Sequence, residues 1–246
     1  MFSKDYTNVG SSSKKGFDQG QRDYMLRIYN LMAIALVVTG AAAFMAVNFE
    51  PLANLLFNFG PNGEFMGQTG FGFFMSFAPL ILAFYLFSTV QTLSVERSRM
   101  LLWAYSALMG VSLAFWAFIY TGESIARTFF ITSSVFAAMS IYGYTTKRDL
   151  TEFGSFLVMG LIGIIIASLV NIFLASPAVY FAISFMGVGI FIGLTAYDTQ
   201  KLKHMYYAVG GGEMGQRYAV VGALTLYLDF INLFLHLLRF FGDRRN

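Results

Sequence analysis

Seven long hydrophobic runs, separated by short polar segments, account for most of this chain. A transmembrane helix needs about 20 consecutive, mostly apolar residues. Inside lipid every backbone polar group must be satisfied within the segment, so each run is expected to be helical. The pattern therefore predicts seven membrane-spanning helices. They cover residues 26–47, 71–90, 100–120, 125–144, 153–175, 179–197 and 219–241.

Composition supports this division of the chain. Of the 246 residues, 57% are hydrophobic and 12% are charged, whereas soluble domains average about 25% charged residues. We predict an all-α membrane protein, a seven-transmembrane-helix bundle over residues 26–246, preceded by a polar cytoplasmic tail over residues 1–25. The absence of cysteine excludes thiolate chemistry, and a net charge of +3 gives no indication of nucleic-acid binding.

The basic residues predict an orientation, because cytoplasmic loops of membrane proteins carry an excess of Lys and Arg. Twelve of the 16 Lys and Arg residues fall on one side: five up to Arg27, two after the second run, two after the fourth and three after the sixth. The N-terminus is therefore expected in the cytoplasm. Arg239, Arg244 and Arg245 break the pattern if the seventh run crosses fully. That run is either a full span, a short segment, a segment inside the bundle or a re-entrant one that leaves its end in the cytoplasm.

The strongest chemical signal is Asp229, about ten residues into the last hydrophobic run. An ionised side chain at the centre of a span costs at least roughly 2.5–3.5 kcal/mol. At about 100° per residue, Asp229 shares one helix face with Thr225, Asn232, His236 and Arg239. Such a polar stripe is expected to face other helices or a wet cavity, so the last helix is predicted to be central. The simplest role for the stripe is hydrogen bonding between helices.

A second acid, Asp198, closes the sixth run near the predicted membrane boundary. If it meets Asp229, the two carboxyl groups will share a proton more readily than both ionise, so the pair would respond to pH and offer a proton or cation path. Calcium takes six to eight oxygen ligands, so Asp198 and Asp229 predict weak, transient calcium binding. Arg97, Arg99 or Arg239 is a candidate latch that closes the site by pairing with the carboxylates.

Three separated segments resemble the signatures of the Bax inhibitor family of membrane proteins, and the likeness is greatest to its bacterial branch. They are residues 195–203 (TAYDTQKLK), 223–234 (ALTLYLDFINLF) and 143–151 (GYTTKRDLT). The resemblance runs from about residue 21 to the C-terminus. It implies seven helices with the last one central, a pH-sensitive calcium leak governed by Asp198 and Asp229, and a latching arginine for which Arg97 and Arg99 are candidates.

Two function classes stay open at this point. One is a pH-gated cation leak of the bacterial inner membrane that needs no cofactor, with calcium or protons as the transported ion. The other is an interaction protein that modulates a membrane-bound quality-control protease or a stress response, as the resemblance implies for some bacterial relatives. No enzyme activity is expected. Intramembrane aspartyl proteases also use two aspartates, but their second motif has glycine before the aspartate, where this chain has Leu228.

Overall fold

The computed structural model describes residues 6–89 and 92–245, and most of them are helical. Seven helices in this part of the chain are long and apolar enough to cross a membrane, which confirms the predicted all-α, seven-span architecture. The spans are formed by α1 (Tyr6–Asn48), α3 (Gly70–Thr89), α4 (Val95–Leu113) with its continuation α5 (Trp116–Ile119), α6 (Gly122–Thr145), α7 (Thr151–Leu174), α8 (Pro177–Val209) and α9 (Glu213–Phe241).

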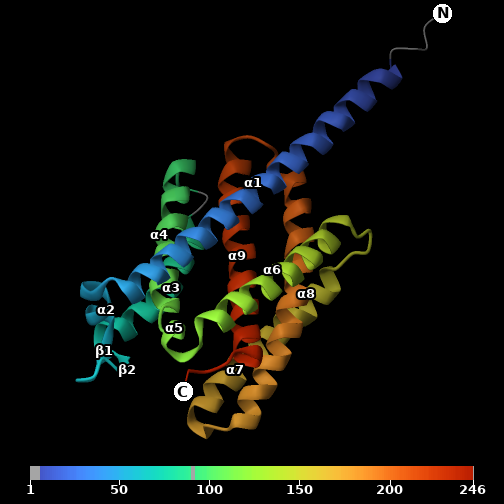
Figure 1. The fold of residues 1–246 in the computed structure, drawn as a ribbon. Helices are drawn as coiled ribbons and strands as arrows, with labels where there is room; N and C mark the ends of the chain where they lie inside the picture. The colour runs from blue at the N-terminus through green and yellow to red at the C-terminus, as the bar shows by residue number, and fades with distance from the viewer. Residues whose placement is uncertain (1–5, 90–91, 246) are drawn as a thin grey trace, which may run out of the picture.

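The helices form one bundle with two distinct ends (Figure 1). We call the end from which α1 projects the N-terminal face; it carries the connections 92–94, 146–150 and 210–212. The opposite end, the C-terminal face, carries residues 120–121 and 175–176 and the segment after α9. Since α9 is one continuous helix that joins the two faces, the last hydrophobic run crosses fully and is neither short nor re-entrant.

The last helix occupies the centre of the bundle, as the polar stripe predicted. Of the most hydrophobic stretch of α9, 67% is buried inside the protein, against 11% for the corresponding stretch of α7. Helices α1, α4, α6 and α8 all pack against α9. In a membrane, α7 and α3 therefore present most of their surface to lipid, whereas α9 is surrounded by protein.

Two segments differ from the expected boundaries. The sixth span was predicted to end at residue 197, where charges begin, but α8 continues to Val209. Thr199, Gln200 and Leu202 are buried, so one face of this extension remains inside the bundle while Lys201 points out. Similarly, α1 begins at Tyr6, so most of the predicted polar tail is helical and continuous with the first span; residues 1–5 lie outside the described part of the chain.

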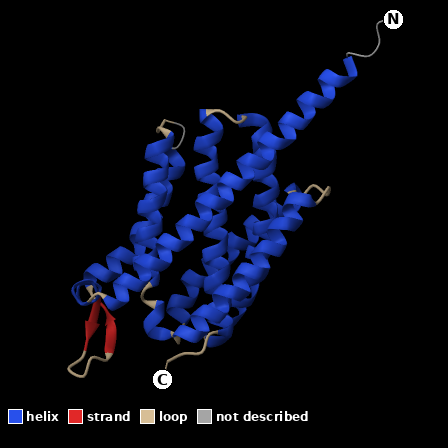
Figure 2. Ribbon diagram, turned by 45° about the horizontal axis from the view of Figure 1, so that its top comes forward, coloured by secondary structure: helices blue, strands red, loops and turns tan. Residues whose placement is uncertain are grey.

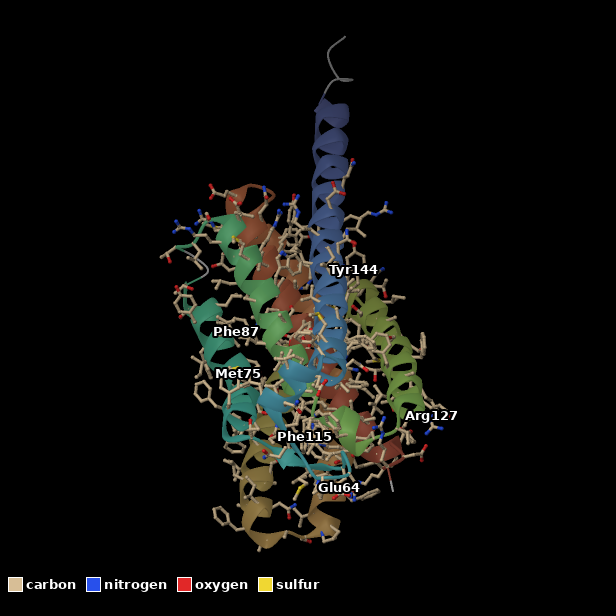
Figure 3. The ribbon with its side chains drawn as sticks, turned by 60° about the vertical axis from the view of Figure 1, so that its left-hand side comes forward. Glu64, Met75, Phe87, Phe115, Arg127 and Tyr144 are labelled. Atoms are coloured by element: carbon tan, nitrogen blue, oxygen red, sulfur yellow. The ribbon has the colours of Figure 1, made fainter. Side chains whose placement is uncertain are left out.

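The acidic loop after the first span contains regular structure that the hydrophobic pattern did not predict. It consists of α2 (Glu50–Leu56) and a hairpin of β1 (Phe57–Phe59) and β2 (Phe65–Gln68), drawn in red in Figure 2. Phe57 and Phe65 pack their rings against Phe118 of α5, with ring centroids 4.8 and 4.7 Å apart. Aromatic packing thus attaches the hairpin to the C-terminal face, where Figure 3 shows Glu64 at its turn.

Candidate intramembrane acidic site

The two predicted acids come together. Asp229 of α9 is buried, Asp198 of α8 is half-buried, and their carboxyl groups face each other at hydrogen-bonding range. The meeting depends on the extension of α8 beyond the predicted boundary, because Asp198 lies inside this helix and not at its end. Helices α8 and α9 pack closely along their length, so each acid reaches the other across the helix interface.

The pair lines a cavity of about 520 Å³ between α7, α8 and α9, which we call the carboxylate cavity. The stripe predicted from the helical period is found here intact, because Thr225, Asn232, His236 and Arg239 all line this cavity. The remaining wall is largely apolar. It is formed by Val158, Leu161, Ile164, Ile165, Ser168 and Leu169 of α7, Phe191 and Leu194 of α8, Leu228 of α9 and Phe87 of α3 (labelled in Figure 3).

Two polar side chains of the stripe leave acceptor oxygens for the cavity. The Thr225 hydroxyl donates to the carbonyl of Val221 at 3.1 Å, and the Asn232 amide nitrogen donates to the carbonyl of Leu228 at 2.8 Å. These bonds use the hydroxyl hydrogen of Thr225 and one of the two amide hydrogens of Asn232, and neither bond uses an oxygen of these side chains as acceptor, so the hydroxyl and amide oxygens remain available as ligands. Asp198, Asp229, Thr225 and Asn232 thus form an oxygen-rich patch on an otherwise apolar wall.

Several polar atoms of the stripe are buried without a partner. Among the described residues, no hydrogen-bond partner is found for Oδ2 of Asp229, Nδ1 of His236 or Nε of Arg239. Buried polar groups in proteins are nearly always hydrogen-bonded, so each exception calls for an explanation, such as a catalytic role or a bound ion or water molecule. The His236 ring instead stacks on Phe191, with centroids 5.6 Å apart.

A glycine on α8 makes room for this histidine. A Cβ atom added to Gly187 would lie 2.4 Å from Cε1 of His236, which is far inside van der Waals contact. Gly189, two residues along the same helix, has nothing within 4 Å of an added Cβ. Close helix approach therefore requires Gly187 specifically.

The candidate latch residues Arg97 and Arg99 lie elsewhere. Both belong to the first turns of α4 at the N-terminal face, where Arg97 is exposed and its backbone N–H donates to the Ser94 cap at 3.3 Å. In the described part of the chain, neither lines the carboxylate cavity; the arginine that does is Arg239. Sequence reasoning had no signal to choose among the three, because α4 and α9 are far apart in the chain.

Residues just after Asp198 hold a connection of the N-terminal face. The Gln200 side chain accepts from the Leu150 N–H at 2.9 Å and donates to the Arg148 carbonyl at 2.7 Å. Lys203 Nζ donates to the Tyr144 carbonyl at 2.7 Å near the end of α6, where a cation is favoured by the helix dipole. The segments 195–203 and 143–151 therefore bind each other, which the sequence could not indicate.

A seven-span all-α membrane protein with a pair of acids between its last two helices is the class that the fold and the cavity define. Comparison with known proteins identifies the family. Residues 21–246 match the family model described as inhibitor of apoptosis-promoting Bax1, and the chain belongs to this Bax inhibitor family.

Bacterial relatives match almost end to end. An uncharacterized protein of Rickettsia prowazekii is 53% identical over 98% of this chain and 99% of its own length. An uncharacterized protein of Caulobacter vibrioides is 47% identical over 93% and 91%. The inner membrane protein YbhL of Escherichia coli K12 is 46% identical over 92% and 94%. The family predicted from the three segments is thus confirmed.

Proposed function

We propose that this protein is a pH-responsive cation leak of the bacterial inner membrane, with calcium as the candidate transported ion. The observation that carries the proposal is the meeting of Asp198 and Asp229 in a cavity between membrane-spanning helices. Ionisable residues inside a membrane bundle are costly and commonly mark ion or proton pathways.

Proton sharing explains the proposed pH response. Two carboxylate groups at hydrogen-bonding range repel each other unless one of them carries a proton, which then bridges the pair. No described N–H or O–H group donates to Oδ2 of Asp229. A proton on the pair is therefore the simplest donor, and its loss or gain would change the charge of the cavity.

The oxygen ligands in the carboxylate cavity suit a calcium ion that passes through better than one that is bound tightly. Calcium needs six to eight oxygens, and the patch offers two carboxylates with the oxygens of Thr225 and Asn232. In the described residues, no group of three or more His, Cys, Asp or Glu side chains is placed to hold a metal ion. A cation at Asp198 and Asp229 would keep part of its water shell and bind weakly, which suits a leak.

The basic residues support a cytoplasmic position for the N-terminal face. Lys147, Arg148, Lys201 and Lys203 all lie at or near this face, and a positive bias of this kind is typical of the cytoplasmic side. The relative YbhL is an inner membrane protein. We therefore propose the same membrane here, with the C-terminal face outside the cytoplasm.

Ion flux into liposomes that contain only this protein tests the proposal. We expect calcium entry that changes with pH between acidic and neutral conditions. In Asp229→Asn the pH dependence should disappear and entry should fall by about tenfold, equivalent to about 1.4 kcal/mol of lost attraction for the passing cation. Asp198→Asn should show the same change.

A matched control is available at the protein surface. Asp243 is exposed and forms an ion pair with Arg127 at 2.8 Å, away from the carboxylate cavity. Asp243→Asn should leave flux and its pH dependence at the level of the unmodified protein. If Asp198→Asn and Asp229→Asn both keep the normal pH dependence, the proposal is wrong.

A second function is favoured by one structural feature. Helix α1 projects well beyond the bundle at the N-terminal face (Figure 1), which offers a surface for a partner such as a membrane-bound protease. Deletion of residues 1–18 keeps Gln21, whose side chain donates to the Lys203 carbonyl at 3.0 Å. Loss of partner capture with unchanged ion flux would show two separable roles.

A further inference from the structure

A second cavity lies close to the carboxylate cavity, at the C-terminal face. It has a volume of about 490 Å³, and we call it the vestibule. Its walls come from three parts of the chain that meet at this face. They are Trp116, Ile119 and Tyr120 at the end of the third span, Asn171, Ala175, Ser176, Pro177 and Tyr180 around the turn between α7 and α8, and Arg244 after α9.

One side chain contacts the walls of both cavities. Arg239 lines the carboxylate cavity, and its guanidinium group stacks over the rings of Trp116 and Tyr180, with 5.3 and 5.7 Å to the ring centroids. Both rings line the vestibule. The position of Arg239 at the boundary therefore follows from contacts on both sides.

The interactions of Arg239 suit a group that closes a passage and can release it. Cation–π contacts hold the guanidinium without a carboxylate partner, and its Nε atom is buried without a hydrogen bond among the described residues. By contrast, Arg127 at the same face donates to Asp243 at 2.8 Å. Arg239 lies ten residues after Asp229, about 15 Å further along α9. A cation entering from the vestibule thus meets a fixed positive charge before it reaches the acids.

We propose that Arg239 is the gate between the vestibule and the carboxylate cavity, closed while Trp116 and Tyr180 hold its guanidinium group. In this state the planar group obstructs the passage, and its charge repels cations. The passage opens when the side chain leaves the two rings. The cation specificity of this step rests on the proposed leak function, whereas the closing of the passage does not.

Thiol labelling tests the gate without any measurement of ion flux. The chain has no cysteine, so Asn232→Cys places one reactive group in the carboxylate cavity. The purified protein in lipid nanodiscs is treated with a cationic methanethiosulfonate reagent, which does not enter lipid. Replacement of Arg239 by Met, which is of similar length but uncharged, should accelerate labelling on the order of tenfold, as expected for losing a desolvated cation–π contact.

Matched variants separate the gate from general effects. Arg127→Met removes an arginine from the same face and should leave the labelling rate unchanged. Arg239→Lys keeps the charge but loses the planar stacking group. The labelling rate at Asn232→Cys should therefore rise less for a cationic reagent than for an anionic reagent of equal size. Equal labelling rates at Asn232→Cys with Arg239 present and with Arg239→Met would overturn the proposal.

A loosened bundle would also accelerate labelling, and two further variants address this. Leu226→Cys reports on the fully buried side of α9 and should stay unreactive in the Arg239→Met background. If Leu226→Cys reacts, variants of the stacking ring distinguish a gate from a loosened bundle. Tyr180→Ala should accelerate labelling at Asn232→Cys, and Tyr180→Phe, which keeps the ring, should not. Equal rates for these two variants overturn the gate.

The outcome also separates the gate from the leak. If Arg239→Met accelerates labelling while the liposomes show no Asp229-dependent flux, the gate stands and the proposed leak fails. If flux depends on Asp229 but labelling is insensitive to Arg239, the leak stands and the gate is wrong.

Discussion

Two polar side chains on opposite faces of α9, Tyr227 and Asp229, are buried in opposite ways. Toward α1 and α4, the Tyr227 hydroxyl pairs with the Thr39 hydroxyl at 2.7 Å, and Thr39 in turn reaches the carbonyls of Ala35 and Ser106 at 2.8 and 3.0 Å. Toward α7, the buried Oδ2 of Asp229 has no hydrogen-bond partner among the described residues. Tyr227 belongs to a satisfied network, whereas Asp229 faces a cavity with unpaired polar atoms.

The difference separates a structural role from a functional one. A buried polar group that keeps its hydrogen bonds contributes modestly to stability, whereas one without them costs about 1–3 kcal/mol. The unpaired oxygen of Asp229 therefore calls for an explanation other than stability. We expect changes around Tyr227 to affect stability and changes around Asp229 to affect transport.

The largest effect is expected where the cavity side is tightly packed. In Gly187→Ala, the added methyl group would overlap the His236 ring, which lies 2.4 Å away at Cε1. Overpacking of this kind typically costs about 1–3 kcal/mol, which should appear as a lower thermal unfolding temperature in detergent. Gly189→Ala is the control and should behave as the unmodified protein. The double variant Gly187→Ala with His236→Ala should recover stability; failure to recover would contradict the packing account.

The satisfied network should respond next. Thr39→Val leaves the Tyr227 hydroxyl without its observed partner, and a cost of about 1–2 kcal/mol is expected. Tyr227→Phe should cost less, because the Thr39 hydroxyl keeps two backbone acceptors. A double-mutant cycle on unfolding should give a coupling of about 0.6–1.7 kcal/mol, with ion flux unchanged. Zero coupling would show that the network does not stabilise the bundle.

Asp229→Asn should behave in the opposite way. The amide supplies an N–H donor without a shared proton, so we expect equal stability or a gain of up to about 1 kcal/mol while calcium entry falls by about tenfold. Unfolding temperature and flux measured on one preparation test this combination. Asp243→Asn, which breaks an exposed ion pair, should lose at most about 1 kcal/mol. A clear loss of stability in Asp229→Asn would show that Asp229 stabilises the fold, as Tyr227 is expected to do.

The smallest effect concerns an exposed carboxylate. Asp149 accepts from the Thr151 hydroxyl at 2.6 Å and from its backbone N–H at 2.9 Å, and these bonds lower the pKa of Asp149 below its ordinary value of 3.8. A lowered pKa stabilises the fold above the ordinary value, and this contribution is lost as pH falls through the lowered value. Thr151→Val should therefore unfold slightly earlier at neutral pH, and the difference should vanish in acid. A difference that persists in acid would point to packing instead.

The sequence predicted the features that depend on local properties of the chain. The seven spans and the central position of α9 follow from hydrophobic length and from the stripe of Thr225, Asn232 and His236, which are local properties. The end of α8 was misplaced because Lys201 and Lys203 reduce hydropathy, although their long side chains reach outward or to a carbonyl while their neighbours stay buried.

Contacts between segments far apart in the chain could not be predicted from the sequence. The meeting of Asp198 with Asp229 was a conditional expectation, and only the fold brings the two acids together. The hairpin had a weak local signal, a Pro61-Asn62-Gly63 turn between two aromatic segments. Which arginine lines the cavity, and that Arg239 stacks on the rings of Trp116 and Tyr180, depend on how separate helices pack. No periodicity encodes these.

The central position of α9 also sets the order in which the molecule can be assembled. Helices enter the membrane as the ribosome produces them, N-terminal segments first, and α9 follows the six other spans. Until it arrives, the Thr39 hydroxyl lacks its Tyr227 partner on α9, and the helices that later surround α9 have no common core. The early spans are therefore expected to associate only loosely at first, and the bundle packs stably only after α9 is inserted. A substitution in α9 would then reduce the yield of folded protein more than an equal change in the lipid-facing α7.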